Sequence, residues 1–178
     1  CSIRAVWGSK RRIESIMAGM EDSIWDDGEW VSWDEINRQI QCQEWRSRFP
    51  KADISLVPIF EELIGLAQDY FQLTGKHLQV YGDIGELYGA ITHGINLHRN
   101  YAKGSDGRLG NDFVEVKTIT PFKRRNVVEI NPERSFSKVL IIKINDEFEV
   151  RGKLIARKAL PKPIGKKILI NWDDFEPK

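Results

Sequence analysis

Two acidic residues and a lysine stand close together in the middle of the chain. Asp106 lies in a glycine-rich turn, and Glu115 and Lys117 follow it in a segment rich in β-branched residues. On a strand, residues i and i+2 face the same side, so Glu115 and Lys117 should project together. The flanking Val114 and Val116 then point the other way, into a core. Carboxylates bind hard divalent cations through oxygen, and an ammonium group can orient water for attack on phosphorus. The pattern is typical of a site that hydrolyses phosphodiesters.

The order of Asp106 and then Glu115-Val116-Lys117 resembles the PD-(D/E)XK nuclease superfamily, which includes restriction endonucleases, repair nucleases and Holliday-junction resolvases. The resemblance covers roughly residues 80 to 145. One departure is that Ser105, and not proline, precedes Asp106. The resemblance implies an α/β protein with a restriction-endonuclease-like core, in the order αβββαβ, whose mixed central sheet is flanked by helices.

The resemblance also implies roles for these residues. Asp106 and Glu115, with the carbonyl of Val116, would hold one or two Mg²⁺ ions, for which Mn²⁺ would substitute. Lys117 would orient the attacking water, and Glu86, on a helix before the sheet, would complete the metal shell. Hydroxyl and basic side chains that follow Lys117 in the chain would contact the phosphates of the nucleic acid: Thr118, Thr120, Lys123, Arg124 and Arg125.

Each of these residues also has a purely structural interpretation. Glu86 stands three residues after Asp83, as in the second half of a capping box. Asp106 fits ordinary turn chemistry, and Glu115 with Lys117 fits an exposed pair on one strand face. Taken together, in this order and on these expected elements, the residues favour the nuclease.

Other candidates for the chemistry are weaker. Asp112 is a rival for the first metal carboxylate, but it lies only three residues before Glu115. His93 and His98 lie five residues apart across an expected helix end, which is a poor spacing for metal ligands. The chain has no G-x-S-x-G, P-loop or C-x-x-C pattern, so we expect no nucleotide cofactor.

Periodicity and capping residues predict the elements that position the site. We expect helices over residues 9–20, from the capping pair Ser32 and Glu35 to about residue 45, over 59–74, and over 83–93 before Gly94. Strands are expected at residues 95–101, 113–119, 127–130, 139–144 and 148–156, with one or two helical turns in 131–136 and a tail from 161. The inward face of the helix over 59–74 is expected to carry Ile59, Leu63, Leu66, Ala67 and Tyr70.

The chain of 178 residues and 20.6 kDa fits one domain with a small appendage. We divide it into a helical, Trp-rich extension over residues 1–57, for target recognition or dimerisation, and a nuclease core over 58–178. Five of the six tryptophans lie in the extension, where a small core is favoured over base stacking. Residues 115–167 carry fourteen Lys and Arg against six Asp and Glu, so this basic half is the expected polyanion-binding surface.

The expected location is cytoplasmic, because the sequence shows no signal pattern, no membrane-spanning run and no disulfide framework. The first hypothesis is a Mg²⁺-dependent endonuclease that cuts DNA, with a restriction-type defence role ahead of repair or recombination. Cutting both strands of a duplex needs two active sites, which predicts a homodimer. The alternatives are a catalytically inactive nuclease-fold module that binds nucleic acid, and a scaffold protein with no nucleic-acid partner.

Overall fold

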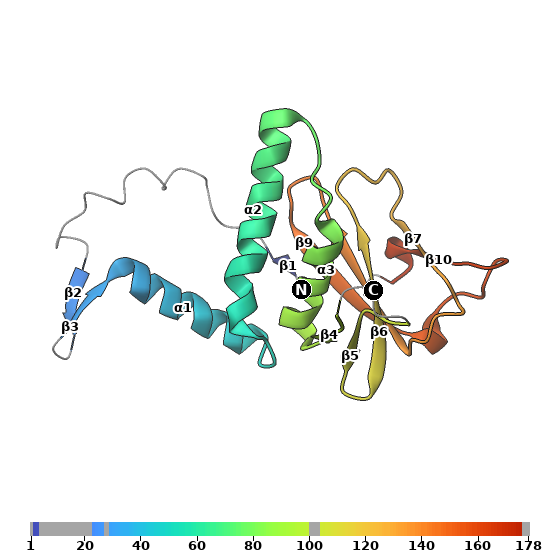
Figure 1. Ribbon diagram of the computed structural model, residues 1–178, viewed down its shortest axis with the longest axis horizontal. Coiled ribbons are helices and arrows are strands. Elements are labelled where there is room, and N and C mark those ends of the chain that lie inside the picture. Colours follow the sequence, from blue (N-terminus) through green and yellow to red (C-terminus); the bar gives the residue numbers. More distant parts are fainter. Residues whose placement is uncertain (1, 4–22, 27–28, 100–103, 176–178) are drawn as a thin grey trace.

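A mixed sheet of six strands, in the order β1-β9-β8-β6-β5-β4, forms the centre of the computed structural model (Figure 1). The structure describes residues 2–3, 23–26, 29–99 and 104–175, and before Val31 it describes the backbone alone. The strands of this sheet are β1 (Ser2–Ile3), β4 (Asn96–Leu97), β5 (Gly107–Leu109), β6 (Asp112–Ile119), β8 (Lys138–Ile144) and β9 (Val150–Ala156). Among them β6 and β8 pair in parallel, and the other neighbours are antiparallel.

Different layers cover the two faces of the sheet. Helices α2 (Val57–Thr74) and α3 (Tyr81–His93) pack on one face. A two-stranded ribbon of β7 (Val127–Ile130) and β10 (Ile168–Asn171), followed by the short helix η4 (Trp172–Phe175), packs on the other. The expectation of an α/β protein with a mixed sheet flanked by helices is therefore confirmed.

Strand β8 shows why the sheet needs two covering layers. Leu140 and Ile142 point into the core beneath α2 and α3, whereas Val139 and Ile141 point into the core beneath the ribbon. All four side chains are buried. A continuous apolar run is the pattern expected of a strand covered on both faces, and this prediction is confirmed.

The connection between the parallel strands β6 and β8 differs from the prediction. The helical turns expected in residues 131–136 are wrong, because this segment forms turns and no helix. Pro132 lacks an amide hydrogen, and the side chain of Asn131 accepts a hydrogen bond of 2.9 Å from the amide of Glu133, which favours a turn. The order αβββαβ thus lacks its second helix here, and β7 leaves the central sheet to pair with β10.

Helix α2 ends where the sequence predicts and begins two residues earlier, at Val57. Pro58 lies in its first turn, and Gly75 ends it in the left-handed conformation with φ 66°. The predicted inward face is right in part: Ala67 is buried and Leu63 packs partly buried against the core, and the other buried residues are Val57, Phe60 and Ile64. Ile59 and Leu66 are instead exposed. Burial of the large Phe60 rotates the helix away from the predicted stripe.

Other differences lie towards the ends of the chain. The segment expected as a tail contains β10 and the buried Ile168, Ile170 and Trp172, so it completes the second core. The short helices η2 (Ile54–Leu56) and η3 (Arg157–Ala159) were not expected. The strand expected over 95–101 shortens to β4 among the described residues.

The first part of the chain is joined to the core at two places. Ser32 caps α1 (Trp33–Arg48) by accepting a hydrogen bond of 3.2 Å from the amide of Glu35, as predicted. Trp45 and Phe49, at the end of α1, are buried in the core beneath α2, and β1 pairs with β9. A hairpin of β2 (Ser23–Asp26) and β3 (Glu29–Ser32) precedes α1, and both extend to one side in Figure 1. The helix expected over 9–20, and the side chains of Trp7, Trp25 and Trp30, lie outside the described parts.

Membrane crossing was not expected from the sequence. In the part of the chain that the structure describes, no helix combines the length and apolar character needed to span a bilayer.

Candidate carboxylate–lysine site

Asp106, Glu115 and Lys117 come together where β5 and β6 begin to separate. Asp106 lies directly before β5, and the hairpin turn predicted around it falls later, at Gly110, whose φ is 62°. A carboxylate oxygen of Asp106 accepts a hydrogen bond of 2.7 Å from the amide of Val116, so this side chain replaces the β5 backbone as a partner of β6. Lys117 Nζ lies 2.6 Å from Glu115 Oε1. Strand alternation therefore places the acid and the lysine on one face, as predicted.

Glu115 is the buried charge of this site. Its side chain has an exposed fraction of 0%, while the neighbouring Val114 and Val116 pack in the core beneath α3. Its Oε2 atom accepts no hydrogen bond from any residue that the structure describes. A buried carboxylate oxygen without a partner is costly, and such groups call for a functional explanation.

Arg134 is a member of the site that the sequence analysis missed. It comes from the turn segment between β7 and β8, and its guanidinium forms an ion pair with Oε1 of Glu115. A second nitrogen of the guanidinium lies 3.6 Å from Asp106 Oδ1. Arg134 follows Glu115 by nineteen residues, so no local spacing could have linked them.

A second arginine holds the segment that carries Arg134. The guanidinium of Arg157 donates hydrogen bonds of 3.1 Å to the carbonyls of Arg134 and Phe136, and another to the carbonyl of Pro132. It also lies 4.5 Å from the centre of the Phe136 ring. Arg157 therefore orders the turn segment in place of the expected helix, and so positions Arg134.

Glu86 lies in the second turn of α3, on the helix that packs against β6. Burial raises its pKa, the negative charges of Asp106 and Asp83 raise it further, and Lys117 opposes this shift. The charges of Asp106 and Lys117 therefore act on the pKa of Glu86, although Lys117 projects from the face of β6 opposite α3. The capping interpretation is wrong, because α3 begins after Val80 and has no side-chain cap.

The residues assigned to phosphate contacts do not all lie together. Thr118 faces α3: a Cβ placed on Gly85 would lie 2.1 Å from its Oγ1 atom. It is thus on the opposite face of β6 from Lys117. Thr120 follows the end of β6, and Lys123, Arg124 and Arg125 are exposed in the next loop. The basic residues remain available to a polyanion, whereas Thr118 is used in packing.

The weaker candidates occupy separate positions. The Asp112 carboxylate lies 2.7 Å from Lys138 Nζ and accepts a 2.8 Å hydrogen bond from Ser137, at the start of β6. Lys138 and Ser137 lower the pKa of this carboxyl. His93 contacts the Thr92 hydroxyl, and His98 contacts the Ser105 carbonyl. These three residues have local partners of their own.

The donor atoms of the site fit a hard divalent cation in their chemistry. Two carboxylates and the Val116 carbonyl supply oxygen ligands, and Oε2 of Glu115, which has no hydrogen-bond partner in the described part of the chain, is available to coordinate a metal ion. Arg134 competes for the same carboxylates, and within the described residues no three His, Cys, Asp or Glu side chains gather as a ready metal site. Binding of a cation therefore requires Arg134 to yield part of its contact.

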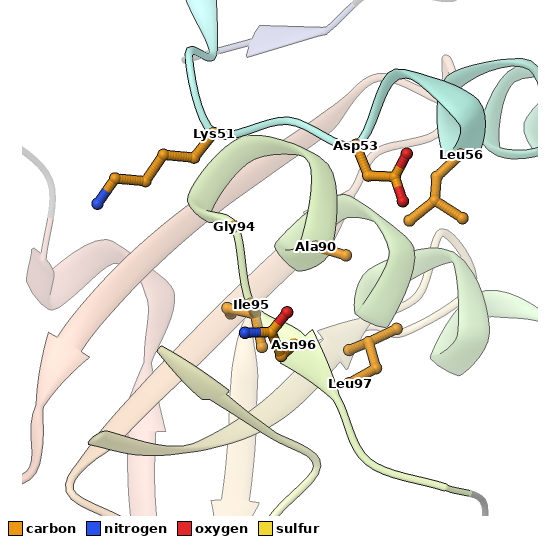
Figure 2. Close-up of a pocket in the computed structure, with 8 residues that line it drawn as sticks. All are labelled: Lys51, Asp53, Leu56, Ala90, Gly94, Ile95, Asn96 and Leu97. Atoms are coloured by element: carbon orange, nitrogen blue, oxygen red, sulfur yellow. The ribbon is translucent and has the colours of Figure 1, made fainter. Parts of the chain in front are cut away.

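A pocket of about 240 Å³ lies elsewhere, between the end of α3, β4 and the segment before α2 (Figure 2). Lys51 extends away from the other labelled residues in that view. Asp53 already accepts hydrogen bonds from the amide and the hydroxyl of Ser55. None of the lining residues belongs to the carboxylate–lysine site, and they offer no comparable group of charges.

Comparison of the chain with protein-family models and with curated proteins gave no match.

Proposed function

We propose that the protein is a metal-dependent endonuclease that hydrolyses phosphodiester bonds of DNA. The observation that carries the proposal is the fully buried Glu115, two residues from Lys117 on one strand face and beside Asp106. Such burial favours a role beyond that of a solvated strand pair, because charged side chains are rarely buried without one. A restriction-endonuclease-like core is supported by the order of α3, the β5–β6 hairpin and the parallel neighbour β8.

Metal binding, orientation of water and positioning of the nucleic acid would fall to different residues of the chain. Asp106, Glu115 and the Val116 carbonyl would hold Mg²⁺, for which Mn²⁺ would substitute, with Glu86 completing the shell. When bound, the ion supplies Lewis-acid polarisation of the phosphate and lowers the pKa of water. Lys117 orients the attacking water, and its contact with Glu115 fixes its direction. The exposed Lys123, Arg124 and Arg125 position the nucleic-acid backbone.

The biological setting that we propose is a restriction-type defence system in the cytoplasm, with repair or recombination as the alternative. Cutting both strands of a duplex would use a homodimer, since each chain supplies one carboxylate–lysine site. No nucleotide cofactor enters this scheme.

A second candidate is a nucleic-acid-binding module without turnover. The observation that favours it is Arg134, which forms ion pairs with both Asp106 and Glu115. In this candidate the guanidinium takes the place of a metal ion permanently. This candidate predicts salt-sensitive binding of nucleic acid and no metal-dependent cleavage.

Cleavage of plasmid and linear DNA with Mg²⁺, with Mn²⁺ and with EDTA tests the proposal. Glu115→Gln and Lys117→Met should each lower the metal-dependent rate by at least about a hundredfold, the effect typical of positioned acid–base groups. Asp112→Asn is the matched control, because Asp112 also pairs with a lysine on these strands but lies at the exposed end. If Glu115→Gln cuts as fast as wild type in a clean preparation, the nuclease proposal fails.

A further inference from the structure

Three aromatic rings form a ladder at the end of the sheet where β6 finishes. The rings of Phe71 and His77 are stacked, with centres 4.4 Å apart and planes 17° apart. His77 is followed by Phe122, at 4.8 Å between ring centres. The residues come from the last turn of α2, the segment before α3 and the loop after β6. Three separate segments thus meet through ring contacts.

The ladder is anchored on one side and open on the other. Tyr81 and Phe148 are almost completely buried, and they lie 5.9 Å from His77 and 6.2 Å from Phe71, between ring centres. The Tyr81 hydroxyl is also 2.9 Å from His77 Nδ1. Phe71 is 36% exposed and Phe122 is 49% exposed. The ring positions are fixed by the core, yet the end of the ladder remains in water.

Positive charge lies directly beside the exposed end. Lys123, Arg124 and Arg125 follow Phe122 in the chain, and all three are exposed. None of them forms an ion pair within the part of the chain that the structure describes. An exposed ring next to three unpaired cations matches the two chemical features of a nucleic acid, a flat base and an anionic backbone.

The ladder lies past the end of β6, the strand that carries Lys117. Lys117 and Phe122 are five residues apart, so their backbones are at most about 18 Å apart along the chain. Because Lys117 projects from the face of β6 opposite α3, a single strand that places a phosphate at Lys117 would pass the end of β6 to reach the loop. Paired bases hide their faces in the duplex stack, so a ring that offers only a stacking surface selects bases that are unpaired.

We infer that Phe71, His77 and Phe122 form a stacking platform for an unpaired base, and that Lys123, Arg124 and Arg125 hold the adjoining phosphates. This inference rests on the proposed nuclease function, because the platform would hold a nucleic-acid strand whose phosphate lies in the carboxylate–lysine site. The substrate class is then nucleic acid with unpaired bases, such as a single strand, a flap or a frayed end. Base identity is not read, since stacking tolerates every base.

Binding measured in EDTA tests this without any cleavage. Fluorescence anisotropy would compare a labelled single-stranded DNA, the duplex of the same sequence and an abasic strand with the same number of phosphates. Phe122→Ala should weaken binding of the single strand about tenfold, the usual effect of one lost stacking contact. Affinity for the abasic strand and for the duplex should change less than twofold.

Control variants separate stacking from folding. Phe122→Leu keeps apolar bulk but has no ring face, so it should lose most of the same affinity while unfolding at the wild-type temperature. Phe113→Ala removes a similarly exposed phenylalanine, 41% exposed on β6 beside Arg108, and should leave binding unchanged. Lys123→Ala should weaken all three ligands and lower the salt dependence of binding by about one ion.

The outcomes are distinct. Equal losses for the single and abasic strands, or equal losses in the Phe122 and Phe113 variants, would overturn the platform. Selective loss of single-strand binding in Phe122→Ala, with no metal-dependent cleavage by wild type, would support the platform and defeat the nuclease proposal alone. Cleavage that proceeds normally while Phe122→Ala binds all three ligands like wild type would defeat the platform alone.

Discussion

Glu115 is a buried negative charge between two cations, and each cation comes from a different part of the chain. Lys117 is two residues away on β6, whereas Arg134 comes from the turn segment before β8. Removing one partner of a buried ion pair leaves an uncompensated charge, which usually costs more than the pair contributed. Arg134 is therefore expected to stabilise the protein without metal and to compete with a bound ion.

Arg134→Gln should show both effects. With EDTA present, the free energy of unfolding should fall by about 2 kcal/mol, because Glu115 keeps only Lys117 as a charged partner. Added Mg²⁺ should restore stability and should bind more tightly than to wild type, as calorimetric titration would show. The control Arg38→Gln removes an exposed pair with Glu35 and should change neither quantity. Weaker Mg²⁺ binding in Arg134→Gln would contradict competition.

Glu86 predicts a pH dependence. Its pKa is raised in the folded protein, by burial first and by Asp106 second, so the folded state binds this proton more tightly than the unfolded state. An ionised Glu86 lowers the stability of the folded protein. This loss is absent below the unfolded pKa of about 4.3 and fully present above the raised folded pKa. In EDTA, Glu86→Gln should therefore raise Tm at pH 7 and leave it nearly unchanged at pH 4.

The matched control for Glu86 is Glu62→Gln, an exposed carboxylate on α2. It should shift Tm by a similar small amount at both pH values. A Glu86→Gln variant that gains stability only at pH 4 would reverse the assignment of burial as the main cause.

At the scale of elements, α3 approaches the sheet through glycines. A Cβ on Gly85 would lie 2.1 Å from Thr118 Oγ1, and a Cβ on Gly89 would lie 2.7 Å from Leu140. The absence of side chains there lets α3 lie close to β6 and β8. The same contact fixes the position of α3, which carries Glu86, relative to β6, which carries Glu115 and Lys117.

Gly85→Ala should destabilise the protein by about 1–3 kcal/mol, because the added methyl group forces α3 away from β6. Gly82→Ala is the matched control on the same helix. A Cβ there meets nothing within 4 Å, so the better helix propensity of Ala should stabilise by about 0.5–1 kcal/mol. Urea unfolding of the two variants gives the comparison. Equal effects from both substitutions would show that the close approach does not matter.

At the scale of the whole molecule, α2 presents an apolar stripe that the core does not use. Ile59, Leu66 and Leu73 are exposed and lie seven residues apart, on one side of the helix. Exposed carboxylates at Glu62 and Asp69 lie beside the stripe. The homodimer of the proposed function would bury this stripe, and the carboxylates of the two copies would then repel each other across it.

Light scattering at increasing protein concentration checks the dimer. Leu66→Glu should shift the chain to a monomer that keeps its fold, because Leu66 is not part of the core, while Tm loses only the contribution of dimer formation. Added salt should strengthen the dimer by screening the carboxylates, whereas it should weaken nucleic-acid binding. A wild-type chain that stays monomeric at all concentrations and salt levels would contradict the proposal.

The sequence by itself determined the features that depend on neighbours along the chain. Glu115 and Lys117 share a strand face because side chains alternate every two residues, and Gly75 and Gly94 end helices because they adopt positive φ without a Cβ clash. The buried run of β8 likewise followed from its continuous apolar residues. Local geometry was enough in each of these cases.

Tertiary structure alone decided the rest. Arg134 reaches Glu115 only because Arg157 holds the turn segment by its carbonyls, and neither contact leaves a periodic signal in the sequence. The ladder at Phe122 likewise joins segments distant along the chain. The inward face of α2 was mispredicted at Ile59 and Leu66 because two apolar stripes compete, and the choice between them depends on which one the sheet can accommodate. Contacts between distant residues are fixed by packing, which no local pattern contains.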